Sequence, residues 1–563
     1  MMRSSVKMVG CLLGATLILS GGWDLPLQAS TSAGGSSSGP ENPGASGGSR
    51  RSASRLIGAR GRRALEDGIW RRAFPRPDDR FDVVVTPTDQ GCSAEIVGHG
   101  TLLNASTLPF YVDGGCTVSL EVQPAPHGFD LVYRISNSTG QPQALPTLQV
   151  PSLNMDGKID FLHHATECEW KTLDASAGQA VWSPTEEYPR QLYAPVVIAR
   201  DSHKAVGLSL EYDMMGWEHS IRTYIGRARA GTTYGNGWNA KFFLDGQLPA
   251  GGSRKYIVNV RVEQPEEWIH TLSPYREFLL RRYGKVKYVQ NLDPVFGVQI
   301  GDSGRLASEN TRGFNGYRAD QNGWQRDITE ILNFAPTAGY RRVMVWTPSG
   351  VYKTNTQNNF PPNFMSEWSS AMERTALEWQ RIGTGGLDLM FWWGRSGQVA
   401  DRWDDPVLDK FDPDNQAQRD EMMAEWALAR QRGAKGVGLD AITQMDGWDI
   451  PKWIDQLRET VPGATVVAEP GCFDVLNLKV PVVMYADNFD SGPMYLADYL
   501  VPGREIWVLL RGADETQARA EEFIRQGLTV IMRGRQFTAN DLQPVIAQVR
   551  EDSRRVQAQD DAE

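Results

Sequence analysis

Two different patterns of apolar and polar residues divide the chain into two parts. Between about Phe81 and Val262, apolar residues alternate with polar ones in short runs such as FDLVYRISN and KYIVNVRVE, and Gly, Pro and Asn separate the runs. A period of two is the pattern of strands with one buried face, and these turn residues suit the connections between antiparallel neighbours. The first half of the chain therefore predicts a large antiparallel β-sandwich.

After the predicted sandwich, the spacing of apolar residues changes from every second residue to that of a helix. The segment 265–284, PEEWIHTLSPYREFLLRRYG, places apolar residues at helical spacing and ends in glycine. Glycine just past the last periodic residue is a common helix stop. This segment predicts a helix that connects the sandwich to the rest of the chain.

After Tyr288 the chain repeats one unit, which is a continuous apolar run followed by a helical segment. Continuous runs are typical of parallel strands covered by helices on both faces. In the helical segment ETQARAEEFIRQG, Asp514 is placed to cap the start and Gly527 to end it. Eight units in about 260 residues match a (β/α)8 TIM barrel. The predicted strands are VFGVQIGD, RRVMVWTP, LDLMFWWG, AKGVGLDA, TVVAEPG, VPVVMYAD, REIWVLLRG and LTVIMRG.

The amino terminus has the pattern of a secretory signal peptide. Arg3 and Lys7 give it a positive start, Met8 to Leu19 form an apolar stretch too short to span a membrane, and small residues near Ala29 suit cleavage. We therefore expect a secreted or periplasmic protein with no membrane span after cleavage. The predicted organisation is a signal peptide (1–29), a disordered Gly/Ser-rich linker (30–79), a β-sandwich (80–263), a connecting helix (264–289), the barrel (290–556) and a tail (557–563).

Composition narrows the possible functions. The net charge of −10 argues against nucleic-acid binding, which usually needs a basic surface. Most of the 18 tryptophans are expected in cores, but some can offer flat apolar faces to a ligand such as a sugar ring. Cys92 and Cys116 are the expected disulfide pair, because both lie in the strand-rich region and export permits disulfides.

Charged residues gather where the predicted barrel strands end. Functional sites of such barrels lie at the carboxyl ends of the strands. A single acid there also suits a helix cap, but acids after strands one, four, five and six together indicate a site. The residues at these ends are Asp302 on strand one, Trp346 on strand two, Trp392, Trp393 and Arg395 on strand three, Asp440 on strand four, Glu469 on strand five, Asp487 and Asp490 on strand six, Arg511 on strand seven, and Arg533 and Arg535 on strand eight.

The residue types at the rim favour glycoside hydrolysis. All seven histidines lie between His99 and His270, before the barrel, so His-ligated metal chemistry and a His general base are not expected there. In glycoside hydrolysis one carboxylate attacks the anomeric carbon or activates water, and a second, protonated one donates to the leaving oxygen. Two carboxylates a few ångströms apart raise one pKa, which supplies that acid near neutral pH. This chemistry implies a carbohydrate substrate and neither a cofactor nor a metal.

The layout resembles retaining (β/α)8-barrel glycoside hydrolases that act on α-linkages, and two groups compete. In the clan D α-galactosidase and α-glucosidase superfamily, often preceded by a β-sandwich, the resemblance makes Asp440 the nucleophile and Asp487 the acid/base. In the α-amylase-like barrels, GVGLDAI again makes Asp440 the nucleophile, and VVAEPG makes Glu469 the acid/base. Both groups carry a cation two residues before the nucleophile, where this chain has Gly438. Arg511 is a possible substitute for that cation.

The remaining rim residues are expected to bind substrate. This set is Asp302, Trp346, Trp392, Trp393, Arg395, Asp490, Arg511 and Arg533. Two other functions stay open, namely a non-catalytic carbohydrate-binding protein on the same scaffold and a lyase or carboxylate–magnesium barrel enzyme. The sandwich is expected to brace the barrel, although its aromatic segment 214–238 is also a candidate to reach over the rim.

Overall fold

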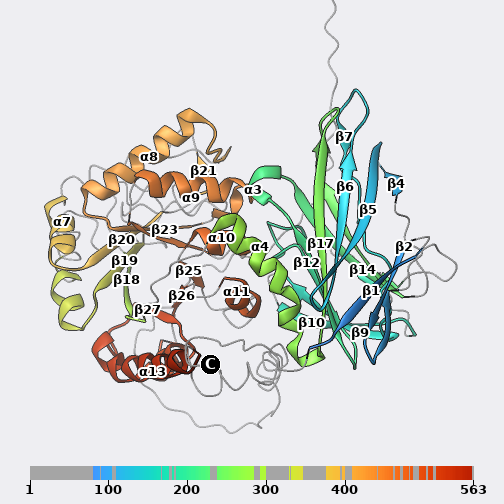
Figure 1. The fold of residues 1–563 in the computed structure, drawn as a ribbon. Coiled ribbons are helices and arrows are strands. Elements are labelled where there is room, and N and C mark those ends of the chain that lie inside the picture. The colour runs from blue at the N-terminus through green and yellow to red at the C-terminus, as the bar shows by residue number, and fades with distance from the viewer. Residues whose placement is uncertain are drawn as a thin grey trace, which may run out of the picture.

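The computed structural model describes most of the chain beyond residue 79. The described residues are 80–88, 91–103, 110–113, 115–165, 168–176, 181–182, 186–227, 237–284, 292–299, 329, 331–346, 376–393, 396–399, 409–440, 442–460, 463–469, 473–480, 482–485, 494–501, 505–510 and 515–560. Figure 1 shows two bodies side by side, a β-rich one from the first half and a barrel from the second.

The first body, called the β-domain below, consists of antiparallel sheets made by β1 to β17. The largest has eight strands in the order β10-β9-β12-β13-β17-β6-β5-β4. Their bounds are β4 (Phe110–Asp113), β5 (Cys116–Ala125), β6 (Gly128–Ser136), β9 (Lys158–His164), β10 (Cys168–Asp174), β12 (Val196–Arg200), β13 (Ala205–Glu211) and β17 (Ser253–Glu263).

A smaller four-stranded sheet packs against the large one. Its order is β11 (Val181–Trp182), β14 (Ser220–Arg227), β15 (Trp238–Asp245) and β8 (Leu148–Gln149). Val197 and Leu208 of the large sheet and Ile225 and Ala240 of the small one line the same narrow apolar cavity. The apolar positions of the period-two pattern thus face each other across this layer. The other β-domain elements are β1 (Val83–Thr88), β2 (Gly91–Ile96), β3 (Gly100–Leu103), β7 (Gln143–Ala144), β16 (Gln247–Leu248) and the short helix α3 (Met214–Trp217).

The second body is a closed barrel of eight parallel strands, and each strand falls within one of the predicted apolar runs. Pairing of Val295 with Ile531 closes it between the first and last strands. The strands are β18 (Val295–Gln299), β19 (Arg342–Trp346), β20 (Asp388–Trp393), β23 (Gly436–Leu439), β24 (Thr465–Ala468), β25 (Val482–Tyr485), β26 (Glu505–Leu509) and β27 (Thr529–Met532).

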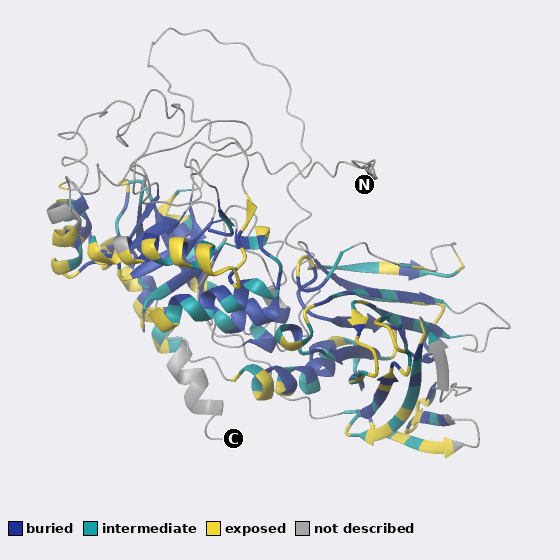
Figure 2. Cartoon of the chain, turned by 90° about the horizontal axis from the view of Figure 1, so that it is seen from above, coloured by how far each residue is buried: buried dark blue, intermediate teal, exposed yellow. Residues whose placement is uncertain are grey.

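Helices cover the outside of the barrel. They are α7 (Ala376–Thr384), α8 (Gln416–Gln431), α9 (Asp449–Thr460), α10 (Asp474–Lys479), α11 (Met494–Leu500), α12 (Gln517–Arg525) and α13 (Ala539–Asp560), with the short elements β21 (Gln398–Val399), β22 (Asp409–Lys410) and η2 (Ile442–Gln444) in the connections. The barrel strands are buried while the outer faces of the helices are exposed (Figure 2). This two-sided burial explains why the strands are continuous apolar runs.

The cap of α12 differs from the prediction. Thr516, in extended conformation, accepts the amide of Arg519 on its hydroxyl at 3.2 Å and so caps the helix start. The expected cap, Asp514, lies outside the described residues. At the other end, Gly527 follows the C-cap with a φ of 81°, so the predicted glycine stop is present.

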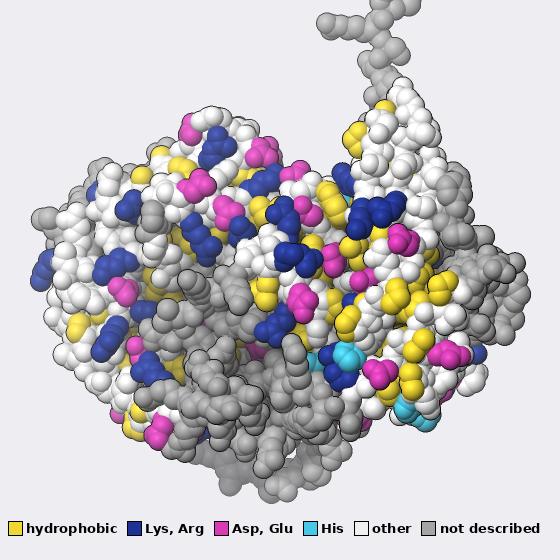
Figure 3. All heavy atoms as spheres, viewed as in Figure 1, with side chains coloured by type: hydrophobic (Ala, Val, Ile, Leu, Met, Phe, Trp, Pro, Cys, Tyr) yellow, Lys and Arg dark blue, Asp and Glu magenta, His cyan; other side chains and the backbone are white. Residues whose placement is uncertain are grey.

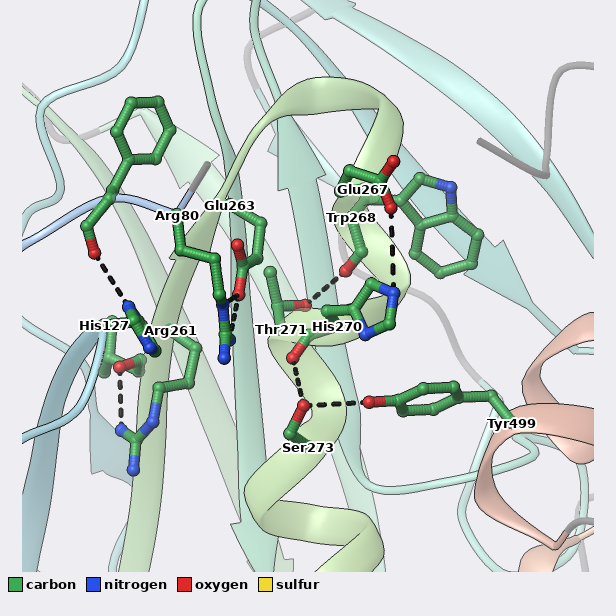
Figure 4. A network of polar contacts seen from close by, with 12 residues as sticks. Arg80, His127, Arg261, Glu263, Glu267, Trp268, His270, Thr271, Ser273 and Tyr499 are labelled. Atoms are coloured by element: carbon green, nitrogen blue, oxygen red, sulfur yellow. Dashed lines mark hydrogen bonds and ion pairs between the residues drawn. The ribbon is translucent and has the colours of Figure 1, made fainter. Parts of the chain in front are cut away.

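The connection between the two bodies is two helices rather than one. The 3₁₀-helix η1 (Pro265–Leu272) is followed by α4 (Ser273–Tyr283), which restarts with a proline in its first turn. Figure 4 shows this junction, where the Ser273 hydroxyl lies 2.8 Å from the Tyr499 hydroxyl of α11. In the same view Arg80 pairs with the buried Glu263 at the end of β17. The Ser273–Tyr499 contact therefore ties the junction to the barrel, and the Arg80–Glu263 pair lies where β17 leads into it.

The predicted disulfide is wrong. Cys92 and Cys116 are free and buried, and they lie on strands of different sheets. The Cys116 thiol instead lies 3.6 Å from the carbonyl of Ala144, to which it can donate. Burial raises the pKa of Cys92 to about 11, so this thiol behaves as a small apolar side chain.

Within the described part of the chain, no helix is both long and apolar enough to cross a membrane. The face visible in Figure 3 mixes basic and acidic side chains instead of gathering one sign.

Candidate active site

Asp440 lies directly after β23, at the carboxyl end of its strand. Its amide donates to the carbonyl of Trp393 at 3.0 Å. Its own carbonyl accepts from the amide and hydroxyl of Ser396, at 2.9 and 2.7 Å. The residue is 7 % exposed. Hydrogen bonds at both the amide and the carbonyl of Asp440 therefore fix the backbone from which its carboxylate extends.

The alternation of β23 turns Asp440 towards the barrel interior. Gly438 faces inward, because a Cβ placed on it would lie 2.1 Å from Cε3 of the interior residue Trp392. The intervening Leu439 packs in the outer core. Side chains two residues apart share a face of a strand, so Asp440 lies on the same side as Gly438.

Glu469 stands beside Asp440 on the neighbouring strand. β24 pairs Ala468 with Leu439, and the Glu469 amide continues this ladder by donating to the Leu439 carbonyl at 3.0 Å. Val467, two residues earlier, faces the barrel interior. This register places the two predicted rim acids at the same height on adjacent strands. Neighbouring strands run about 4.8 Å apart. Glu469 is partly exposed, whereas Asp440 is buried.

Two of the predicted tryptophans meet inside the barrel. The rings of Trp346 and Trp392 lie 5.9 Å apart between centroids, tilted by 39°. They are 8 % and 3 % exposed, and both belong to the interior cluster of side chains. Ring pairs at this separation stabilise one another beyond simple burial. They form an aromatic layer beneath the strand ends that carry Asp440 and Glu469.

Two glycines make room for this layer. A Cβ on Gly297 would lie 2.8 Å from Cζ3 of Trp346, and one on Gly438 would overlap Trp392. A long cationic side chain at position 438 would have to enter the space that Trp392 fills. The packing therefore explains why this chain has glycine where the families it resembles carry a cation.

The predicted Arg533 also belongs to the interior side. It follows β27, and its Cγ lies 3.1 Å from the Cβ position of Gly297, beside Trp346. Glu515 accepts the amides of Arg533, at 2.5 Å, and of Gly534, which fixes this strand end. Arg535 differs, because its guanidinium lies 4.8 Å from the ring centroid of Phe334. Arg533 thus remains with the site, whereas Arg535 packs on a helical segment outside the barrel.

Trp393 lies on the opposite face from Trp392. Its side chain is 0 % exposed and packs in the outer core, with its ring 6.0 Å from that of Trp453 on α9. A ligand in the barrel mouth does not reach this face. The structure therefore separates Trp393 from Trp346, Trp392 and Arg533.

Five predicted site residues lie outside the described part of the chain. These are Asp302, Arg395, Asp487, Asp490 and Arg511.

The opposite end of the barrel holds a second polar cluster that the sequence analysis did not identify. Glu505, at the start of β26, accepts from Arg342 at 3.2 Å, from the Trp507 indole at 2.7 Å and from the Thr529 hydroxyl at 3.0 Å. Arg342 also donates to the carbonyl of Asp293. Glu505 is 8 % exposed, and its charge is compensated by the buried guanidinium. The amino-terminal end of the barrel is thus closed by a paired, hydrogen-bonded network.

The sequence analysis also missed the hydrogen-bonding partners around the rim. Ser396 follows β20, and Glu515 precedes α12, and each binds backbone groups of other segments. A lone serine or glutamate in a loop carries no periodic signal. Among the described residues, no group of three or more His, Cys, Asp or Glu side chains is arranged to hold a metal ion.

No family model and no curated protein matches the chain. Solved structures similar to the chain include an α-N-acetylgalactosaminidase from Bifidobacterium bifidum in complex with GalNAc. It is 10 % identical, with a TM-score of 0.48 over 83 % of this chain and 84 % of that one. An α-galactosidase from Thermus thermophilus, in complex with p-nitrophenyl α-D-galactopyranoside, is 13 % identical, with a TM-score of 0.41 over 78 % and 94 % of the two chains.

A third structure, a trehalulose synthase mutant in complex with Tris, is 12 % identical, with a TM-score of 0.28 over 42 % of this chain and 60 % of that one. The first two of these proteins are glycosidases by name.

Proposed function

We propose that the protein is a secreted glycosidase that hydrolyses an α-glycosidic bond of an oligo- or polysaccharide by a retaining mechanism with two carboxylates. The observation that carries this proposal is the placement of Asp440 and Glu469 at equal height on adjacent strands, above the pair Trp346 and Trp392. The strand spacing of about 4.8 Å is similar to the ~5 Å that separates the two carboxyl groups in retaining enzymes.

Asp440 is the proposed nucleophile. Its carboxylate attacks the anomeric carbon and forms an acyl-glycosyl bond while the glycosidic C–O bond breaks. The acid/base gives its proton to the leaving oxygen in this step. In the second step a water molecule gives a proton to the acid/base and attacks the anomeric carbon, which releases the sugar and restores the Asp440 carboxylate.

Glu469 is the acid/base that the described contacts favour, since it is the acid on the strand adjacent to Asp440. Asp487, predicted at the end of the next strand, remains the alternative. In either case, the ionised Asp440 opposes ionisation of a nearby acid, and its partner then keeps the proton that it must donate.

The substrate platform is proposed to be the apolar faces of Trp346 and Trp392, with Arg533 beside them. Sugar rings present C–H faces that pack on aromatic rings, while their hydroxyls need polar partners. Asp302, Arg395, Asp490 and Arg511 complete the proposed binding set. The preference for α-linkages is taken from the resemblance of the GVGLDAI segment to enzymes of that specificity.

The first test is hydrolysis of a panel of p-nitrophenyl α- and β-glycosides and of polysaccharides. We expect turnover of at least one α-glycoside, and initial release of the α-anomer by NMR. Asp440→Asn is expected to lower kcat by about 10⁴-fold or more, because an amide of nearly the same shape cannot attack carbon. Asp446→Asn is the matched control, since Asp446 is on the same connection but pairs with Lys410, and its side chain is 44 % exposed.

The second test separates the two acid/base candidates. Loss of the acid/base should leave kcat/KM, which reports the first step, nearly unchanged for a 2,4-dinitrophenyl leaving group, because this group needs no protonation. For an alkyl glycoside it should lower kcat/KM by about 10²-fold or more. We expect this pattern for Glu469→Gln and not for Asp487→Asn. The reverse pattern would exchange their roles.

Three outcomes would contradict the proposal. A wild type that binds oligosaccharides but turns over none of the panel is a binding protein. Activity that chelators remove and magnesium restores indicates the carboxylate–magnesium alternative. Equal kcat in wild type and Asp440→Asn removes the proposed nucleophile.

A further inference from the structure

One short segment of the β-domain contacts the connections that follow both proposed catalytic strands. This segment, residues 188–193 with the sequence YPRQLY, lies between β11 and β12 and is called the docking segment here. On the barrel side it meets the β24–α10 connection, which begins with Glu469, and the β23–α9 connection, which begins with Asp440. In Figure 1, α10 and α4 lie between the barrel strands and the β-domain.

The contact with the β24–α10 connection is a buried carboxylate clamp. The Tyr188 hydroxyl donates to Oδ1 of Asp474 at 2.8 Å, and the Tyr275 hydroxyl of α4 donates to Oδ2 at 2.6 Å. The Asp474 amide donates to the carbonyl of Tyr193 at 2.9 Å. Tyr188, Tyr275 and Asp474 are all 0 % exposed. The first residue of α10 is therefore held by two phenols and one carbonyl from outside the barrel.

A second phenol of the docking segment continues the clamp by one helical turn. The Tyr193 hydroxyl donates to Oδ1 of Asn477 at 3.2 Å. Asn477 is 1 % exposed and lies three residues after Asp474 on α10. Both ends of the docking segment thus hydrogen-bond the same short helix.

The contact with the β23–α9 connection is steric. A Cβ on Gly447 would lie 2.2 Å from Cγ of Pro189, so the Gly447 backbone lies directly against the proline ring. Gly447 is buried, and it comes two residues before α9. The same segment that clamps Asp474 therefore also limits the path of the chain that leaves Asp440.

Each connection is consequently held at two points a few residues apart. Glu469 is fixed by its ladder bond to Leu439, and Asp474, five residues on, by the docking segment. Asp440 is fixed by its bond to Trp393, and Gly447, seven residues on, by Pro189. The described ends of each connection are thus held from both bodies, and misplacement of catalytic groups by about 1 Å can cost about 10²-fold in rate.

We propose that the docking segment is a positioning element that holds Asp440 and Glu469 at their working separation, with Tyr188, Pro189 and Tyr193 acting through Asp474 and Gly447. The proposal rests on the proposed glycosidase function. It gives the β-domain a part in catalysis without a contact to substrate.

The test measures kcat, KM and melting temperature for Tyr188→Phe, Tyr275→Phe, Gly447→Ala and the pair Asp474→Asn and Asp474→Leu, on the full chain well below each melting temperature. The matched control is Tyr133→Phe, which removes a buried phenol that donates to the Gln149 carbonyl at 2.7 Å within the β-domain. We expect kcat to fall about 5- to 50-fold in the docking variants with KM within about 2-fold. Asp474→Asn, which keeps the shape and one acceptor, should retain more kcat than Asp474→Leu. Tyr133→Phe should keep the wild-type kcat at a similar loss of melting temperature.

Hydrogen exchange gives a second readout that needs no turnover. The amides of Asp440 and Glu469 should exchange faster in Tyr188→Phe than in Tyr133→Phe. The positioning proposal is overturned if the docking variants match Tyr133→Phe in both kcat and exchange while Asp440→Asn is inactive, and the proposed function then stands. If Asp440→Asn is as active as the wild type, the proposed function falls and the positioning role falls with it.

Discussion

The two ends of the barrel use the same residue type in opposite ways. At the amino-terminal end, Glu505 accepts three hydrogen bonds and faces the buried Arg342, so its charge is compensated. At the carboxyl end, Asp440 and Glu469 emerge side by side from adjacent strands. Two neighbouring acids oppose each other's ionisation, whereas an acid beside an arginine favours it. Under the proposed function, the acids at the carboxyl end serve chemistry, whereas the paired Glu505 at the amino-terminal end serves stability.

The largest expected effect is on turnover, and it separates the two ends. Asp440→Asn should lower kcat by about 10⁴-fold or more, because the nucleophile is lost, and should change the melting temperature much less than a substitution in the Glu505 network. Kinetics and calorimetry on the same preparation check this. A large drop in melting temperature with kcat retained would mean that the carboxyl end is also structural.

The next effect is a loss of stability with turnover retained, the reverse of the effect expected for Asp440→Asn. Glu505→Gln should lower the free energy of unfolding by about 3–5 kcal/mol, because it leaves the Arg342 guanidinium buried without a counter-charge. Urea titration measures the loss, and kcat at low temperature should stay close to that of the wild type. Loss of turnover without loss of stability would show that the Glu505 network at the amino-terminal end of the barrel acts on the site.

A third prediction concerns pH and the docking segment. Burial raises the pKa of Asp474 from an ordinary value near 3.8 to about 6, although Tyr188 and Tyr275 donate to it. Between pH 4 and 6 the folded protein therefore holds a proton on Asp474 that the unfolded chain has released. The contribution of Asp474 to the free energy of unfolding is thus most favourable below pH 4 and is lost as the pH rises through 6. The loss is on the order of 3 kcal/mol.

Urea titrations between pH 4 and 8 check the sign. The difference in unfolding free energy between wild type and Asp474→Asn should shift in favour of the variant as the pH rises. The other titratable groups near Asp474 are the buried phenols of Tyr188 and Tyr275 and the partly buried phenol of Tyr283. Their pKa values are raised, so they stay neutral across this range. A pH-independent difference would mean that Asp474 is ionised throughout.

The smallest expected effect tests the aromatic layer. Gly438→Ala places a methyl group within 2.1 Å of Cε3 of Trp392, so the ring must move. We expect a loss of about 1–3 kcal/mol in unfolding free energy and a higher KM, because the proposed platform is displaced. Gly140→Ala is the control, since a Cβ there meets nothing within 4 Å. An unchanged KM would remove Trp392 from the substrate site.

Sequence patterns predicted the barrel well because its signal is local. Each strand is an apolar run, and the end of each run locates a rim residue such as Asp440 or Glu469 without knowledge of the fold. Which of Trp392 and Trp393 points into the barrel and which points towards the helices was not predictable in this way. When both faces of a strand are buried, both positions are apolar, and only the structure shows which ring enters the barrel.

The contacts between the two bodies could not be predicted because they carry no local pattern. Tyr188 and Asp474 lie 286 positions apart, and neither interrupts the periodicity of its own segment. The disulfide prediction failed for a related reason, since shared strand-rich sequence does not place Cys92 and Cys116 on the same sheet. The β-domain was expected to brace the barrel, with the segment 214–238 as an alternative element over the rim. In the described part of this segment, Glu218 lies 2.8 Å from Lys452 of α9.

The most direct test of Asp440 as nucleophile is to trap the covalent intermediate. A 2-deoxy-2-fluoro glycoside with a 2,4-dinitrophenyl leaving group, built on a sugar that the wild type hydrolyses, should form an ester that accumulates. Fluorine slows both steps by disfavouring the oxocarbenium-like transition state, and the activated leaving group restores the first. The account predicts a mass increase of one fluorosugar per chain, located by peptide mapping on Asp440 and absent from Asp440→Asn. A label on another residue, or turnover of the wild type with inversion and no label, would contradict it.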